Sequence, residues 1–118
     1  MRRGEIWTVS AGLDYAGKPR PSVIVQDDTF DRMDSVTVCG FTSSTTDAPL
    51  IRLLIEPSER NELCVPSRLM VDRLLTVPRS KVGERIGQPD VEDLVRLNQA
   101  MMVLLGLAVS PRRAPNAE

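Results

Sequence analysis

The spacing of hydrophobic runs along the chain constrains its fold most strongly. Short runs rich in β-branched residues recur roughly every 8 to 12 residues, and segments rich in glycine, proline and polar residues separate them, which is typical of antiparallel strands joined by turns. The expected strands are Gly4–Ser10, Ser22–Gln26, Val36–Phe41, Ile51–Ile55, Leu63–Val71 and Leu74–Val77. Pro66 lies inside one of them, which predicts an edge strand or a bulge there. Asp27–Ser35 could hold one helical turn.

The hydrophobic period changes after Gly87. Asp90 is expected to be the N-cap of a helix that ends near Gly106, because apolar residues then recur at helical spacing. These residues are Leu94, Leu97, Met101, Leu104 and Leu105. The predicted fold class is therefore α+β and mostly β: a strongly bent antiparallel sheet or small barrel with a C-terminal α-helix packed on it.

The length indicates one domain. At 118 residues the chain is too short for two sizeable cores, so residues 1–109 are expected to form a single domain and 110–118 a disordered tail. No apolar run is long enough to span a bilayer, and no signal-like segment follows the first arginines. Cys39 and Cys64 lie in apolar runs and are expected to be buried, reduced thiols. We therefore expect a cytoplasmic protein.

The complete absence of histidine excludes several kinds of chemistry. Histidine is the commonest general acid or base near neutral pH, so triads of serine, histidine and aspartate, cysteine–histidine dyads and two-histidine ribonuclease mechanisms are all ruled out. Zinc sites that contain histidine are ruled out as well. The formal net charge of −1 means that any attraction to nucleic acid must come from a local basic patch.

Two polar loops remain as candidate sites. The segment Asp14–Pro21 brings a carboxylate, an aromatic ring, Lys18 and Arg20 together just before a buried strand, and loops on rigid strands are where active sites concentrate. Arg20 is well placed there to hold a phosphate. The hydroxyl-rich run Thr42–Asp47 follows the end of another strand and could donate hydrogen bonds to the same group.

Several segments, in order, resemble the MazF/PemK/Kid toxins, which are ribosome-independent endoribonucleases called mRNA interferases. Arg3–Trp7 is similar to the family's RGEIW start, and Gly17–Val25 to its segment G-x-R-P followed by β-branched residues. Phe41–Ser43 resembles its strand end, and Val71–Val77 its segment around a conserved acidic residue and R-T. The C-terminal helix into Leu107 is also similar, so the resemblance covers about residues 2 to 107.

The resemblance implies an SH3-like barrel of the CcdB/PemK type. It also implies a metal-independent, cofactor-free endoribonuclease that cuts single-stranded RNA at specific sequences and so stops translation and growth. The attacking group would be the RNA's own 2′-OH, which leaves 2′,3′-cyclic phosphate and 5′-OH ends. The expected partners are a second copy, which would form a homodimer, and a cognate MazE-like antitoxin.

Carried over by position, the catalytic residues are expected to be Arg20, Thr42, Asp14 and Asp72. The guanidinium and the hydroxyl would stabilise the charged phosphorane, and one of the two carboxylates would accept the 2′-OH proton, since arginine stays protonated in proteins. The expected RNA-binding residues are Lys18, Ser43, Ser44, Arg79 and Lys81.

The chain departs from the family pattern at three positions. Arg73, Leu75 and Pro78 stand where the family usually has glutamine, arginine and aspartate, which puts base recognition and dimer contacts in question. Two rival functions also stay open at this point. One is a non-enzymatic gyrase poison of the CcdB type on the same barrel, and the other is a nucleic-acid-binding barrel without catalysis.

Overall fold

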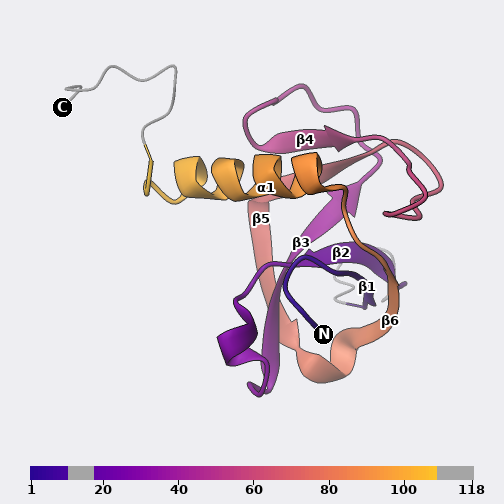
Figure 1. Ribbon diagram of the computed structural model, residues 1–118, viewed down its shortest axis with the longest axis vertical. Helices are drawn as coiled ribbons and strands as arrows, with labels where there is room; N and C mark the ends of the chain where they lie inside the picture. Colours follow the sequence, from indigo (N-terminus) through magenta and orange to yellow (C-terminus); the bar gives the residue numbers. More distant parts are fainter. Residues whose placement is uncertain (11–17, 109–118) are drawn as a thin grey trace.

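The computed structural model describes residues 1–10 and 18–108. They form an antiparallel sheet of six strands and one α-helix, α1, with two short 3-10 turns, η2 and η3 (Figure 1). This confirms the predicted mostly-β fold with a C-terminal helix. The elements are β1 (Ile6–Val9), β2 (Arg20–Ile24), η2 (Asp28–Phe30), β3 (Ser35–Thr42), β4 (Arg52–Ile55), β5 (Ser67–Pro78), η3 (Arg79–Lys81), β6 (Val82–Gly87) and α1 (Val91–Leu104).

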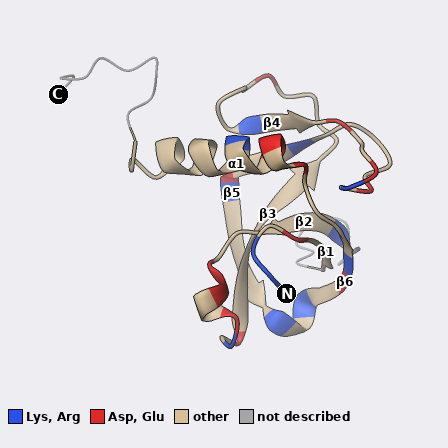
Figure 2. Ribbon diagram, viewed as in Figure 1, with Lys and Arg blue, Asp and Glu red and all other residues tan. Residues whose placement is uncertain are grey.

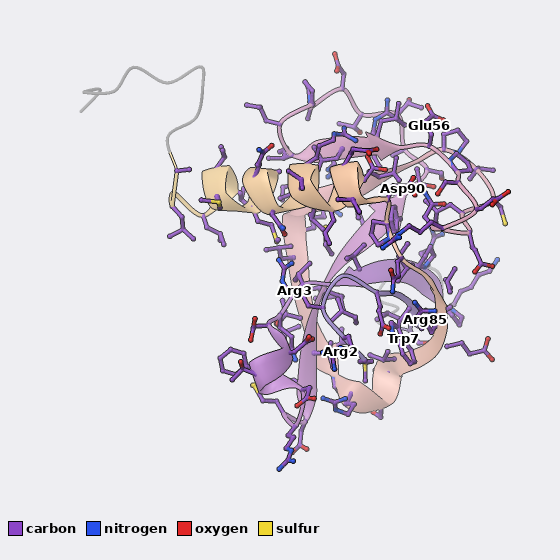
Figure 3. All side chains as sticks on the ribbon, viewed as in Figure 1. Arg2, Arg3, Trp7, Glu56, Arg85 and Asp90 are labelled. Atoms are coloured by element: carbon purple, nitrogen blue, oxygen red, sulfur yellow. The ribbon has the colours of Figure 1, made fainter. Side chains whose placement is uncertain are left out.

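The sheet has the strand order β4-β5-β3-β2-β1-β6. Its β2, β1 and β6 end curls away from the long strands β3 and β5, and α1 crosses the opposite end beside β4 and β5 (Figure 1). At the curled edge, the Glu5 carboxylate ties β6 to β1. It accepts hydrogen bonds from Trp7 Nε1 at 3.0 Å and Arg85 Nε at 2.9 Å, and the two donors lie next to each other in Figure 3.

Alternating side chains divide the core between the two faces of the sheet. Under α1, the helix residues Leu97, Ala100 and Met101 pack on inward-facing residues of the sheet such as Ile6 and Leu69. A second cluster of β-branched residues fills the inside of the curl on the other face: Val9, Ile24, Val36, Val38 and Val77. Because side chains alternate along a strand, β1, β2, β3 and β5 each supply both clusters.

The helix begins and ends where the sequence predicts. Asp90 is the N-cap, and Gly106 follows the last turn with φ of 76°, a left-handed conformation that suits glycine at a helix C-terminus. The predicted apolar stripe is only partly buried, however. Leu97 is fully buried, whereas Leu104 and Leu105 are 39% and 58% exposed. The helix extends past the sheet there, so its last turn packs little on the rest of residues 1–10 and 18–108.

The sequence-based strand assignment is wrong in the second half of the chain. Residues 63–66 are not in a strand, and Leu74–Val77 is not separate, because β5 runs unbroken from Ser67 to Pro78. The prediction of an edge strand or a bulge at Pro66 is wrong as well. Pro66 precedes β5, which pairs with β4 on one side and β3 on the other, and the irregularity in β5 lies farther along, between Leu69 and Leu74. The edge strand β6 was missed, because its glycines and charged residues hide its strand character.

The two cysteines differ in environment. Cys39 is fully buried, and burial, with a smaller contribution from the negative charge of Asp72, raises the pKa of its thiol to about 12. Cys64 is exposed, which corrects the prediction that both thiols are buried, because it lies in the loop before β5 and not in a strand. Within residues 1–10 and 18–108, no helix is long and apolar enough to cross a membrane.

Candidate functional site

A groove of about 510 Å³ lies on the face of the sheet that α1 does not cover. Its walls come from β1, β2, β3, β5 and η3, and its lining includes four basic residues: Lys18, Arg20, Arg73 and Lys81. No acidic residue lines it in the described part of the chain. In a protein with a net charge of −1, this groove is a local concentration of positive charge suited to an anion. Figure 2 shows basic residues on the turn between β5 and β6, which contributes Lys81 to the groove.

The middle of the groove is apolar. Gly40 lies on its surface, and a side chain there would meet Met70 Cε at 3.3 Å and Ser22 Oγ at 3.5 Å. The glycine therefore keeps this part of the groove open. The other apolar lining residues are Val9, Pro21, Val38, Phe41, Met70, Leu74, Leu75, Val77 and Pro78. Such a surface can contact the flat face of a base, while the cations around it contact phosphates.

The β2–β3 register places Arg20 opposite Thr42. Ser22 pairs with Gly40 in this antiparallel ladder, and two residues farther along each strand the same register brings Arg20 and Thr42 level with each other on the same face. Arg20 is half-buried and lines the groove. Thr42 is the last residue of β3, just beyond the lined part. The continued register therefore places these two predicted catalytic residues level with each other on neighbouring strands, with Arg20 in the groove and Thr42 at its end.

The Thr42 hydroxyl is already oriented by the chain that follows it. Its oxygen accepts a hydrogen bond from the Ser44 backbone N–H at 3.1 Å. A hydroxyl can accept and donate at the same time, so the Thr42 proton stays available for a substrate oxygen.

Asp72 is engaged elsewhere. Its two carboxylate oxygens accept hydrogen bonds from the Arg52 guanidinium, at 2.7 Å from Nε and 3.1 Å from the terminal nitrogen. This bidentate contact holds the pKa of the Asp72 carboxyl below its ordinary value. Asp72 does not line the groove. A low pKa and two occupied oxygens make it a poor acceptor for a substrate proton.

The predicted RNA-binding residues separate into three groups. Lys18 and Lys81 are exposed and line the groove beside Arg20. Ser43 and Ser44 are exposed in the loop after β3, where Ser44 Oγ lies 2.9 Å from Thr46 Oγ1. Arg79 is directed away from the groove.

The Arg79 guanidinium holds the loop after η2 in place. It donates from Nε to the Met33 carbonyl at 3.0 Å and from a terminal nitrogen to the Asp31 carbonyl. These contacts give Arg79 a structural role at the base of η3.

Two further points concern residues outside these groups. Asp14, the other predicted proton acceptor, lies outside the described residues. Arg73, which the sequence marked only as a departure from the family pattern, lines the groove. The other two departures, Leu75 and Pro78, line it as well. Their clustering in one short segment was the available signal. Across the described residues, no three acidic or cysteine side chains gather as a metal site would require.

Comparison with known proteins assigns the family. Residues 2–105 match the family described as the PemK-like, MazF-like toxin of type II toxin–antitoxin system. A probable endoribonuclease MazF from Mycolicibacterium smegmatis is 51% identical over 108 residues, covering 92% of this chain and 99% of the relative.

Solved structures share the fold at low sequence identity. A mycobacterial endoribonuclease in complex with its cognate antitoxin is 18% identical, with a TM-score of 0.76 over 93% of this chain and 99% of that one. The Mycobacterium tuberculosis toxin MazF-mt6 is 20% identical, with a TM-score of 0.74 over 88% and 98%. MazF from Deinococcus radiodurans is 17% identical, with a TM-score of 0.73 over 90% and 96%. The family match over nearly the whole chain and the 51% identical relative together establish that this chain belongs to the PemK-like, MazF-like toxins of type II toxin–antitoxin systems.

Proposed function

We propose that this chain, an endoribonuclease of the MazF-like toxin family, cuts single-stranded RNA in the basic groove between β2, β3 and β5. The observation that carries the proposal is the position of Arg20 and Thr42 on the same face of neighbouring strands, two residues beyond the last pair of the β2–β3 ladder, beside a groove lined by cations. Single strands suit this groove, since their bases can turn toward an apolar surface while their phosphates contact basic residues.

In the proposed reaction the RNA supplies its own nucleophile. The 2′ oxygen attacks the adjacent phosphorus, a bond forms between them, and the bond from phosphorus to the 5′ oxygen breaks. A carboxylate of the protein takes the proton from the 2′-OH and a water molecule protonates the leaving 5′ oxygen, so the products are a 2′,3′-cyclic phosphate and a 5′-OH. The protein needs no nucleophile of its own. Its task is to stabilise the negative charge of the pentacoordinate phosphorane and to move protons.

Arg20 and Thr42 perform the electrostatic part of this task. The guanidinium can donate two parallel hydrogen bonds to phosphate oxygens, and the Thr42 proton is available for another because its oxygen is held by Ser44. Each such contact, aimed at charge that develops in the transition state, typically contributes on the order of 3 kcal/mol. No metal ion is required for these steps.

Proton transfer is assigned to a carboxylate. Of the two candidates from the sequence, Asp72 is held by Arg52 with a lowered pKa, so we assign the role of proton acceptor to Asp14. Lys18 and Lys81 bind the RNA backbone next to Arg20, and Ser43 and Ser44 contact the strand where it leaves the groove past Thr42.

The proposed partners follow from the family and from one exposed surface. Val91, Val95, Met102 and Leu105 are exposed along α1 at the spacing of a heptad seam, which favours a homodimer in which these residues are covered. A cognate MazE-like antitoxin is proposed as the inhibitor, since structures of related toxins with antitoxins share this fold. The place of action is the cytoplasm, where the RNA substrate is. The family match and the 51% identical relative favour this function over a CcdB-like gyrase poison.

The test is an incubation of purified protein with a single-stranded RNA in EDTA, followed by analysis of the product ends. Cyclic phosphate and 5′-OH ends are expected, and the same RNA with a 2′-deoxy sugar at the cut position should stay intact. An RNA that survives, or one cut in spite of the 2′-deoxy sugar, would contradict the proposal.

A further inference from the structure

The strand β5 carries a bulge at the edge of the groove. Where β3 advances two residues, from Cys39 to Phe41, the paired residues on β5 change from Leu74 to Leu69, which is five positions. The extra residues of β5 include Asp72 and Arg73. A bulge of this kind bends a strand and changes the direction of its side chains, and such bulges are common beside active sites.

The bulge separates two neighbouring charges. Asp72 pairs with Arg52 on β4, away from the groove, whereas Arg73 is exposed and lines the groove. Within residues 1–10 and 18–108, the Arg73 guanidinium forms no hydrogen bond and no ion pair. An exposed arginine on the wall of an anion-binding groove, with its donors uncommitted, is suited to a phosphate.

Arg73 and Arg20 lie on opposite walls. Arg20 is on β2 and Arg73 on β5, and the two strands flank β3, which puts these strands about 10 Å apart at the usual spacing. Arg73 precedes Leu74, which pairs with Cys39, so the two arginines are also offset along the strands and their backbones lie roughly 12–14 Å apart. This is the span of a step or two along an extended nucleic-acid backbone. Gly40, Met70 and Leu74 line the groove in its apolar middle. The groove thus alternates cation, apolar surface and cation, as a strand alternates phosphate, nucleoside and phosphate.

We propose that Arg73 binds a phosphate of the RNA next to the one that is cut, so that the strand is held at two points across the groove. The inference rests on the proposed function and adds a substrate-positioning residue to it. Since a phosphate contact carries no sequence information, Arg73 contributes affinity and register but does not choose the cut sequence.

The first experiment compares Arg73→Gln with the wild type in binding an RNA made uncleavable by a 2′-deoxy sugar at the cut position. The variant should bind about tenfold more weakly, as expected for one charged hydrogen-bonded contact, and the slope of log affinity against log salt should fall by about one. Arg32→Gln is the matched control, because Arg32 is exposed and lies outside the groove. It should leave both quantities unchanged. Arg73→Lys, which keeps the charge, should keep most of the slope.

The second experiment locates the contact. Neutral methylphosphonates replace the phosphates flanking the cut position one at a time. For the wild type, one of these replacements should weaken RNA binding by about the same factor as Arg73→Gln does. In the Arg73→Gln variant, the same replacement should weaken binding no further.

Two results would overturn the inference. One is an Arg73→Gln variant with unchanged affinity and salt dependence, and the other is a changed preference for the cut sequence at an unchanged slope, which would make Arg73 a base reader. Both results leave the proposed function standing if the wild type still cuts RNA. Failure of the proposed function would appear instead as uncut RNA with the wild type.

Discussion

The two faces of the sheet are built from the same strands but differ in almost every physical respect. On β2, Val23 faces the helix-covered core while Ser22 faces the groove, and on β3 the same holds for Cys39 and Gly40. The helix-covered face is apolar and fully packed. The groove face is open, and basic residues surround its apolar middle. The difference teaches that strand alternation separates the residues that stabilise the fold from those that bind RNA. Substitutions on the helix-covered face should therefore change stability but not cleavage, and substitutions in the groove should change cleavage but not stability.

Truncation of the helix-covered core should have the largest effect on stability. Leu97 is fully buried, so Leu97→Ala removes packed side-chain volume and should lower the free energy of unfolding by about 2–5 kcal/mol. Denaturant unfolding measures this change. Cleavage by the folded variant, assayed well below its melting temperature, should match the wild type. A large loss of cleavage with little change in stability would break the separation of the two faces.

Removal of the Thr42 hydroxyl should affect chemistry far more than stability. Thr42→Val keeps the shape of the side chain but loses the donor and the exposed hydrogen bond from the Ser44 N–H, and single-turnover cleavage should slow by about tenfold to a hundredfold. Thr42→Ser should retain most of the rate. Thr45→Val is the control, since Thr45 is an exposed threonine of the same loop. Equal rates for the Thr42→Val and Thr45→Val proteins would remove Thr42 from the site.

The smallest effect is expected at Asp72, which pairs with Arg52 on β4 and does not line the groove, although the family resemblance implied a catalytic acid there. Asp72→Asn should lower the free energy of unfolding at pH 7 by up to about 1 kcal/mol, as for a partly exposed ion pair, and should leave cleavage unchanged.

The pH dependence of that difference has a defined sign. The pKa of Asp72 is lowered in the folded protein, so the ion pair contributes fully above the carboxyl's ordinary pKa of 3.8. Its contribution is lost as pH falls through the lowered folded value. The difference in stability between wild type and variant should therefore start to shrink below about pH 4 and disappear only once the pH is below the lowered folded pKa. If Asp72→Asn instead had wild-type stability and a hundredfold lower cleavage rate, Asp72 would be the proton acceptor.

Much of the fold follows from local pattern in the sequence. Strands β1 to β4 and the helix α1 carry strong alternation or helical period, and the predicted positions lie close to the observed ones. Strand β6 has little such pattern, because Gly83, Glu84 and Arg85 are exposed at the sheet edge and pair with β1 rather than filling a core. Its strand character comes from a partner more than seventy residues away, which no local window detects.

The site was predictable to a different degree. Arg20 and Thr42 could be named from short motifs, and the β2–β3 register explains why motifs far apart in sequence lie level with each other. The sequence could not predict that Arg73 lines the groove while its neighbour Asp72 does not, because this difference depends on the bulge in β5. Likewise, the commitment of Arg79 to backbone carbonyls depends on how the loop after η2 folds back.

The central claim is that a fixed guanidinium in the groove stabilises the charge of the reacting phosphate. The most direct measurement is the single-turnover cleavage rate of Arg20→Ala in EDTA, with Arg32→Ala as control and unfolding curves for both. The account predicts a loss of a hundredfold or more for Arg20→Ala, on the order of 3 kcal/mol, with near wild-type stability and a normal rate for the control. Cleavage by Arg20→Ala at the wild-type rate would contradict it.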